Sequence, residues 1–310
     1  MKWKKLGKIF EVNNNYDWMI SHVSNPVVER ISKGTYRIYF STRDINNISR
    51  VGYIDVIPRE NFKVINISNE AVLEQGELGT FDDRGVSIGC IVNFKRKKYL
   101  YYVGWNLLKT APFMNSIGLA VYDEAIQKFK RCDNAPIIQR SKADPFSVSY
   151  PFIIKEDNKL RMWYGSHLTW GDGDAKNMKH CIKYAESKDG ANWDIRDIKC
   201  INLYDNEIAV SRPFVIKDEG LYRMWYSYAT KEFYNGKIIY RIGYAESQDG
   251  IKWLRKDREV GIDISQIGWD NESISYPFIF DEIETGTRYM LYNGNQYGKS
   301  GLGAAILVEE

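Results

Sequence analysis

Hydrophobic and polar positions along this chain repeat about every 62 residues. A short polar run, then Pro or Gly, then an apolar run occurs five times, anchored at Pro26, Gly89, Pro151, Pro213 and Pro277. An aromatic residue inside a second apolar run recurs at similar spacing, at Phe40, Tyr102, Tyr164, Tyr226 and Tyr292. A third, alternating run follows each time (VGYIDV, IGLAVYD, IKYAES, IGYAES and LGAAIL). Such a period indicates structural units that pack against their neighbours.

Each of these runs predicts a β-strand. They are short, rich in Val, Ile, Tyr and Phe, and bounded by turn segments such as KEDNK and KDEG. In the third and fourth repeats, AESKDGANW and AESQDGIKW predict an Asp-Gly turn into a fourth, outer strand. We expect the tryptophans of these segments, Trp193 and Trp253, to be buried between neighbouring units.

Four antiparallel strands repeated five times predict an all-β fold, a five-bladed β-propeller. The blades are expected at about residues 18–70, 80–135, 143–200, 205–260 and 270–310, so the whole chain forms one domain. The fifth repeat stops after its third strand. We expect the N-terminal segment, residues 1–12, to supply its outer strand and close the ring, with Trp3 placed as Trp193 is. The alternative is a disordered start.

Composition narrows the class of protein. With 44% hydrophobic residues the chain can bury a large core, and a net charge of +3 does not favour nucleic acid as a partner. The N-terminus lacks the apolar region of a secretory signal, and no apolar stretch reaches the ~18 residues of a membrane span. The four cysteines show no metal-ligand spacing. These features predict a cytoplasmic protein with reduced thiols, no cofactor and no metal site; they leave its oligomeric state open.

The residues just before the five anchors are candidates for a functional site. In a propeller the first strand of each blade lines the central channel, so these residues meet in one funnel. They are unusually polar and include the carboxylates Asp82, Asp83, Glu207 and Glu272. Carboxylates from different blades suit glycosidic chemistry, in which one acid donates a proton and another is ionised. We therefore predict catalytic roles for Asp83, Glu207 and Glu272; the alternative is that each is merely exposed.

Other residues at the same rim are predicted to bind the substrate. From the first strands these are His22, Asn25, Arg84, Tyr150, Arg212 and Tyr276, and from the ends of the second strands Arg43, Asp44, Trp105 and His167. Trp105 suits the face of a sugar ring. The arginines either neutralise nearby acids or bind a substrate anion. The third histidine, His180, is expected in an exposed loop.

Two long segments resemble a known group of proteins. YPFIIKEDNKLRMWYGS with YAESKDGANW, and RPFVIKDEGLYRMWYS with YAESQDGIKW, are similar to the five-bladed propeller glycoside hydrolases. That group includes arabinanases and β-xylosidases, invertases and levansucrases, and mannoside phosphorylases. The resemblance covers all five repeats. It implies acids in blades one, two and three, whereas here SHVSNP and FSVSYP carry none, and only Asp82 and Asp83 match.

Three functions follow from this sequence. The first is a glycoside hydrolase or phosphorylase acting on a glycosidic bond of an intracellular oligosaccharide or activated sugar, with an anionic group on the substrate as one option. The second is a non-hydrolytic glycan-binding or polysaccharide-biosynthesis protein on the same scaffold, favoured by the missing acids. The third is a protein-interaction propeller, which predicts an exposed apolar patch.

Overall fold

The computed structural model of the chain describes residues 1–14, 16–171, 178–234 and 237–309. The runs predicted to be strands are strands, and the described part is almost entirely β. Its helical segments are short: the four-residue α1 (Asn295–Gly298) and two 3-10 turns, Pro58–Glu60 and Asp257–Glu259.

The strands form antiparallel sheets that follow the sequence repeat. One sheet contains β2 (Ser21–Ser32), β3 (Thr35–Arg43), β4 (Ser49–Ile57) and β5 (Lys63–Ile67). A second contains β6 (Val86–Phe94), β7 (Lys97–Asn106), β8 (Met114–Asp123) and β9 (Lys128–Arg131).

The next two repeats share one larger sheet. Its first part contains β10 (Val148–Glu156), β11 (Lys159–Thr169), β12 (Lys179–Ser187) and β13 (Asp194–Ile201). Its second part contains β14 (Glu207–Asp218), β15 (Leu221–Tyr234), β16 (Lys237–Ser247) and β17 (Leu254–Arg255). A single parallel bridge, from His180 to Ala209, joins the two parts.

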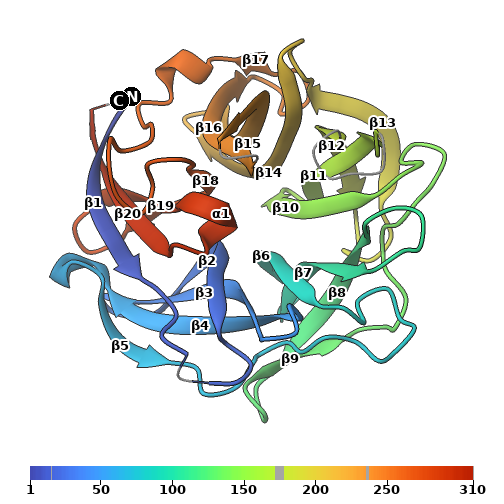
Figure 1. Cartoon of the computed structure of the whole chain (residues 1–310), viewed down its shortest axis with the longest axis horizontal. Helices are drawn as coiled ribbons and strands as arrows, with labels where there is room; N and C mark the ends of the chain where they lie inside the picture. Colours follow the sequence, from blue (N-terminus) through green and yellow to red (C-terminus); the bar gives the residue numbers. More distant parts are fainter. Residues whose placement is uncertain (15, 172–177, 235–236, 310) are drawn as a thin grey trace.

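The last sheet combines both ends of the chain. It contains β18 (Ser275–Glu282), β19 (Thr287–Asn293), β20 (Leu302–Glu309) and, beside β20, the N-terminal β1 (Lys2–Phe10). The register places Trp3 opposite Leu307, and the two termini lie side by side (Figure 1).

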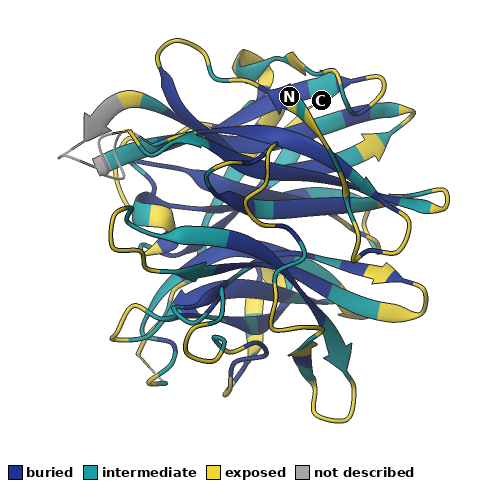
Figure 2. Cartoon of the chain, turned by 90° about the vertical axis from the view of Figure 1, so that its right-hand side faces the viewer, coloured by how far each residue is buried: buried dark blue, intermediate teal, exposed yellow. Residues whose placement is uncertain are grey.

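The sheets are arranged around a common axis, with β2, β6, β10, β14 and β18 nearest the centre (Figure 1). Figure 2 shows buried residues along the strands and exposed residues mainly on the connecting loops. Four-stranded antiparallel sheets arranged around an axis in an all-β chain are consistent with a β-propeller.

The predicted Asp-Gly turns, between the third and fourth strands of a repeat, contact the preceding repeat. Gly190 and Gly250 have φ of 86° and 72°, the left-handed region that glycine tolerates. The carbonyl of Gly250 accepts a 2.8 Å hydrogen bond from the Trp163 indole of the preceding repeat. Trp253 packs edge-on against Trp163, and Trp193 packs in the same way against Tyr101. Trp193 and Trp253 thus pack between repeats as predicted, but both are only partly buried.

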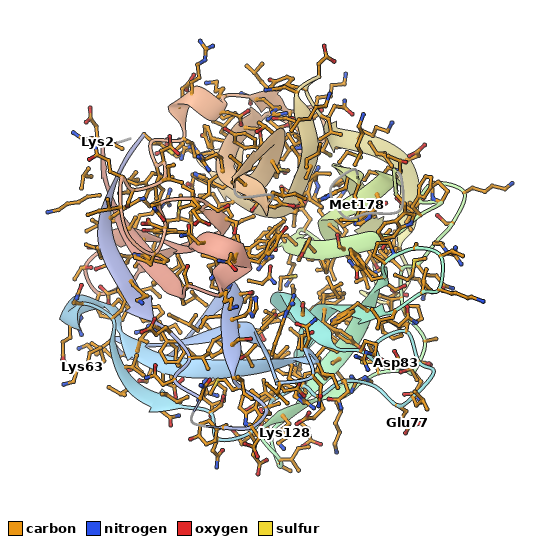
Figure 3. All side chains as sticks on the ribbon, viewed as in Figure 1. Lys2, Lys63, Glu77, Asp83, Lys128 and Met178 are labelled. Atoms are coloured by element: carbon orange, nitrogen blue, oxygen red, sulfur yellow. The ribbon has the colours of Figure 1, made fainter. Side chains whose placement is uncertain are left out.

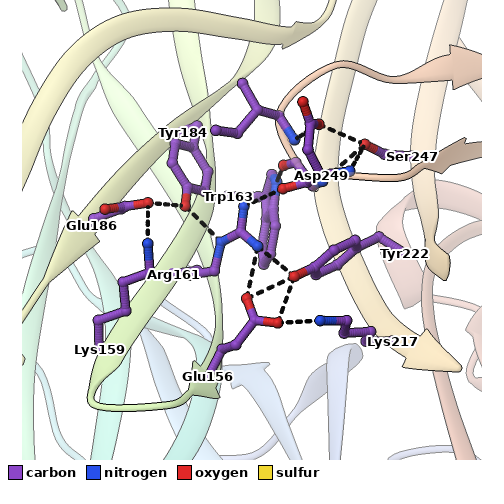
Figure 4. A network of polar contacts seen from close by, with 12 residues as sticks. Glu156, Lys159, Arg161, Trp163, Tyr184, Glu186, Lys217, Tyr222, Ser247 and Asp249 are labelled. Carbon is purple, nitrogen blue, oxygen red and sulfur yellow. Dashed lines mark hydrogen bonds and ion pairs between the residues drawn. The ribbon is translucent and has the colours of Figure 1, made fainter. Parts of the chain in front are cut away.

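A polar network around Arg161 ties the same two repeats together (Figure 4). Arg161 is 5% exposed and pairs with Glu156 at 2.8 Å. Its guanidinium also donates to the hydroxyls of Tyr184 and Tyr222 and to the carbonyl of Asp249. Since every contact goes to a charged or polar acceptor, the buried cation is fully compensated.

The recurring second-strand tyrosine is anchored by an aspartate, which is buried in three repeats and partly buried, as Asp257, in the fourth. The four tyrosine hydroxyls donate to carboxylates that also contact a cation: Tyr102 to Asp82, Tyr164 to Asp144, Tyr226 to Asp257 and Tyr292 to Asp270. The cations are Arg131, Lys183, Arg255 and Lys5. Burial next to a carboxylate raises the pKa of each tyrosine. Asp82, one of the polar residues of the predicted funnel, is therefore part of the scaffold.

Candidate functional site

A β-bulge at each sequence anchor aims side chains at the axis. The pairing of first and second strands shifts register at all five anchors, between Ser24 and Val27 in β2 and at the equivalent places in β6, β10, β14 and β18. Four residues immediately before a proline adopt left-handed backbone with φ from 48° to 56°: Asn25, Tyr150, Arg212 and Tyr276. Non-glycine residues rarely adopt this conformation, and bulges commonly re-aim side chains at functional sites.

A cavity of about 300 Å³, here called the central cavity, opens at these bulges. Its lining offers hydroxyls, amides, imidazoles, aromatic rings and one guanidinium. No carboxylate lines it among the residues that the structure describes. The lining residues are Ser24, Asn25, Ser41, Arg43, Ser49, Ser87, Phe113, Asn115, Tyr150, His167, Met178, His180, Ser211, Tyr240, Tyr276 and Tyr297.

A second cavity of about 340 Å³, the side cavity, continues from the first and shares five lining residues with it: Arg43, Ser87, Phe113, Asn115 and Tyr150. Trp105 and Leu107 lie on its wall. The Trp105 indole donates a 2.8 Å hydrogen bond to the hydroxyl of Ser49, which fixes the orientation of the ring. The two cavities together form an elongated site with a polar and an aromatic part.

Two tyrosine pairs contribute to the central cavity. The hydroxyls of Tyr150 and Tyr276 lie 3.4 Å apart, and the rings of Tyr240 and Tyr297 pack edge to face with centroids 5.6 Å apart. Burial raises the pKa of Tyr276 and Tyr240 well above the ordinary value. The hydroxyls of Tyr276 and Tyr240 are therefore neutral hydrogen-bonding groups at physiological pH.

Two histidines stack at the edge of the same cavity. His167 and His180 face each other across β11 and β12, and their rings are parallel to within 16° with centroids 4.9 Å apart. Both are buried, and neither Nδ1 atom has a hydrogen-bond partner within the described residues. Burial lowers the pKa of His180 to about 4 and that of His167 well below its ordinary value. The expectation that His180 lies in an exposed loop is wrong, because β12 begins one residue earlier and pairs it with His167.

Of the residues predicted to bind substrate, six line the two cavities: Asn25, Arg43, Trp105, Tyr150, His167 and Tyr276. Arg212 is fully buried beside the cavity-lining Ser211. The other three, His22, Asp44 and Arg84, are not on either wall. Asp44 closes a turn by accepting hydrogen bonds from the backbone of Asn46 and Ile48 and from Arg50.

None of the three acids predicted to be catalytic lines either cavity. Glu207 is 3% exposed and forms a bidentate pair with Arg255. Asp83 accepts a 3.0 Å hydrogen bond from the backbone of Gly79 and lies toward the periphery, away from the axis (Figure 3). Glu272 is half-buried beside Ser273, whose hydroxyl accepts a hydrogen bond from the backbone of Tyr240.

The cavity residues not found from the sequence include Phe113, Asn115, Tyr240 and Tyr297. They come from the start of third strands, the loops before them and α1, whereas the anchors indicate only first and second strands. The alternating apolar run of the third strand could have indicated Asn115 and Tyr240 as cavity residues, since both lie close to the start of such a run. We find none for Tyr297.

Two further properties concern metals and membranes. Within the described residues no group of three or more His, Cys, Asp or Glu side chains is placed to hold a metal ion. The described helices include none with the length and apolar character needed to cross a membrane.

Known structures share this fold. A glycoside hydrolase superposes with a TM-score of 0.73 at 15% identity, covering 98% of this chain and 90% of that one. A thermostable family-43 glycoside hydrolase gives 0.64 at 18% identity, covering 96% and 93%. The α-L-arabinofuranosidase of Podospora anserina gives 0.66 at 13% identity, covering 98% and 96%. The resemblance to the propeller glycoside hydrolases is thus confirmed in the fold.

Sequence comparison points to nearer relatives. No family model matches the sequence. "Uncharacterized protein Rv1502" of Mycobacterium tuberculosis strain H37Rv is 42% identical over 308 residues, 99% of each chain. "Uncharacterized protein MT1551" of strain CDC 1551 matches to the same extent. Proteins that are 42% identical over nearly their full length are homologous and share a fold. The chain therefore belongs to the family of the mycobacterial protein Rv1502.

Proposed function

We propose that the central and side cavities bind a carbohydrate and that this protein recognises a glycan. The observation that carries the proposal is the lining itself: closely spaced hydroxyl, amide and imidazole groups next to the aromatic faces of Trp105 and Phe113. Sugars present hydroxyls that need both donors and acceptors, and apolar ring faces that pack on aromatic side chains.

The shape of the site supports an oligosaccharide as the ligand. The central cavity has room for about one sugar unit, and the side cavity extends it toward Trp105. A protein with this fold binds a glycan: the Podospora arabinofuranosidase was solved in complex with cellotriose. We also infer that the scaffold has five blades in a single domain and that β1 closes the ring by completing the sheet of β18–β20.

Cleavage of a glycosidic bond is the second candidate function. It requires two carboxylates on either side of the scissile bond, separated by roughly 5 to 10 Å. Glu272 favours it, because within the described residues its carboxylate neither pairs with a cation nor accepts a hydrogen bond, while its backbone is held by Asn295. Of the other two predicted acids, Glu207 is paired with Arg255 and Asp83 lies toward the periphery. Among the described residues no carboxylate lines either cavity, which favours recognition over cleavage.

A glycan panel analysed by isothermal titration calorimetry and by mass spectrometry of products tests both functions. We expect binding of an oligosaccharide without turnover, weakened by Tyr150→Phe and unaffected by Ile267→Ala at a site 84% exposed. Turnover that disappears in Glu272→Gln, with binding retained, would make cleavage the function. Absence of binding to every glycan would contradict the proposal.

A further inference from the structure

Arg212 is a buried cation without a counter-ion. Its side chain is fully buried, and it forms no ion pair with any residue that the structure describes. Its one hydrogen bond runs from Nη2 to the carbonyl of Pro26 at 3.3 Å, and Nε and Nη1 have no partner. Burial lowers its pKa to about 10, so the guanidinium is still charged at neutral pH. Leaving a charge in this state costs stability.

The other buried cations of this chain are compensated. Arg161 pairs with Glu156, and Lys183 pairs with Asp144 and Asp197. Arg255, nearly as buried, pairs with Glu207. The protein thus places an acid next to a buried cation elsewhere and omits it at Arg212. This contrast indicates that the missing negative charge comes from a ligand.

The surroundings of Arg212 connect it to the central cavity. Ser211, the preceding residue, lines the cavity. Tyr150 and Tyr276 line it too, and both lie close enough to the guanidinium to affect its pKa. Because Arg212 itself has no exposed surface, a ligand contacts the hydroxyls of Tyr150 and Tyr276 and not the guanidinium. It still interacts electrostatically with the guanidinium, because the protein interior screens charge poorly.

A second positive charge lies on the wall of both cavities. Arg43 donates to the neutral amide of Asn47 and has no ion pair within the described part of the chain. The pKa of His22 falls to about 4 because the residue is buried and because Arg43 and Lys299 are positively charged nearby. The nearest acid in sequence, Asp44, is already paired with Arg50. The rim is therefore electropositive.

We propose that the ligand of the central cavity carries an anionic group, a carboxylate or a phosphate, which binds the hydroxyls of Tyr150 and Tyr276 between Arg43 and Arg212. This inference rests on the proposed function and names its substrate class: an acidic or phosphorylated sugar. Arg43 contacts the anion directly. Arg212, buried behind the two tyrosines, compensates the anion's charge without contact. The hydroxyls of both tyrosines donate hydrogen bonds to the anion.

Calorimetry on the full chain with matched sugars tests the inference. The probes are glucose, galactose and mannose, each as the neutral sugar, the uronate and the 6-phosphate, with inorganic phosphate and acetate alone as further arms. We expect one anionic form to bind ~10-fold or more tightly than its neutral parent. Inorganic phosphate binding as tightly as the sugar phosphate would instead identify free phosphate as the source of the anion.

Two variants make the test specific. Arg43→Gln, at the rim, should lower affinity for the anionic sugar ~10-fold and affinity for the neutral sugar by a smaller factor. Arg212→Met should do the same while folding at least as stably as the wild type, because it removes an uncompensated charge. Should Arg212→Met fail to fold, Arg43→Gln and the salt dependence of wild-type binding decide the matter.

The two proposals fail in different ways. Equal binding of neutral and anionic sugars, or a preference unchanged in both variants, overturns the anion inference and leaves glycan recognition standing. Phosphate binding that depends on Arg212, without binding of any sugar in the glycan panel, overturns glycan recognition and leaves an anion site. Binding of nothing in either panel overturns both.

Discussion

Arg255 donates hydrogen bonds to both carboxylate oxygens of Glu207, one at 2.6 Å and one at 2.8 Å. The pair is buried, and Glu207 also accepts from the backbone of Tyr204. A carboxylate held by this many donors has no free face for a substrate. Glu207 therefore has the contacts of a scaffold residue at the start of β14.

Glu207→Gln should lower the free energy of unfolding by roughly 3 kcal/mol, because it leaves a buried guanidinium only partly compensated. Urea denaturation followed by tryptophan fluorescence measures the change. The exposed neighbour variant Asp205→Asn is the control and should be close to neutral. An unchanged stability combined with loss of a catalytic activity would return Glu207 to its predicted catalytic role.

Tyr164→Phe should cost about 1 to 3 kcal/mol of stability, since it leaves Asp144 buried with one donor fewer. Tyr122→Phe removes a hydrogen bond to Gln127 at an exposed position and should stay within about 0.5 kcal/mol of the wild type. Thermal and urea unfolding of both variants provide the comparison. Equal losses in the two would mean that the buried tyrosine–aspartate pair does not stabilise the repeat.

Acidification should destabilise the fold through its buried histidines. The pKa of His180 is about 4 in the folded protein and about 6.5 when unfolded, so the unfolded state binds more protons between these values. The stability contributed by the neutral imidazole is complete above pH 6.5 and is lost as the pH falls toward 4. We expect a loss of about 2 kcal/mol from His180 alone between pH 7.5 and pH 5. Urea midpoints across this range should fall less steeply in His180→Gln; identical slopes would contradict the assignment.

Trp105→Ala should weaken binding of an oligosaccharide about 10-fold through lost apolar contact and change binding of a monosaccharide little. The reason is that Trp105 lies on the side cavity and not on the central one. Titration with a chain-length series of the ligand found in the panel measures this difference. A uniform loss at every length would place the aromatic contact in the central cavity instead.

Local patterns were sufficient to predict much of this architecture. Apolar runs, Asp-Gly turns and the prolines of the anchors are properties of short segments, and backbone preference acts at that range. The repeat register then indicated which strand ends meet at the axis. This is why the sequence alone was sufficient to predict Asn25, Tyr150 and Tyr276 as residues of the site, and all three line the central cavity.

Contacts between distant segments required the folded chain. Glu207 looked like a free acid in a loop because its partner Arg255 comes from another strand 48 residues later. His180 is buried only because β12 pairs it with His167, and Tyr297 reaches the cavity from a turn outside the repeat pattern. Whether a charged side chain is neutralised depends on what packs against it in three dimensions. The sequence therefore predicted the repeating strands and the position of the funnel. Tertiary packing decided that Glu207 is paired and that Arg212 has no ion pair among the described residues.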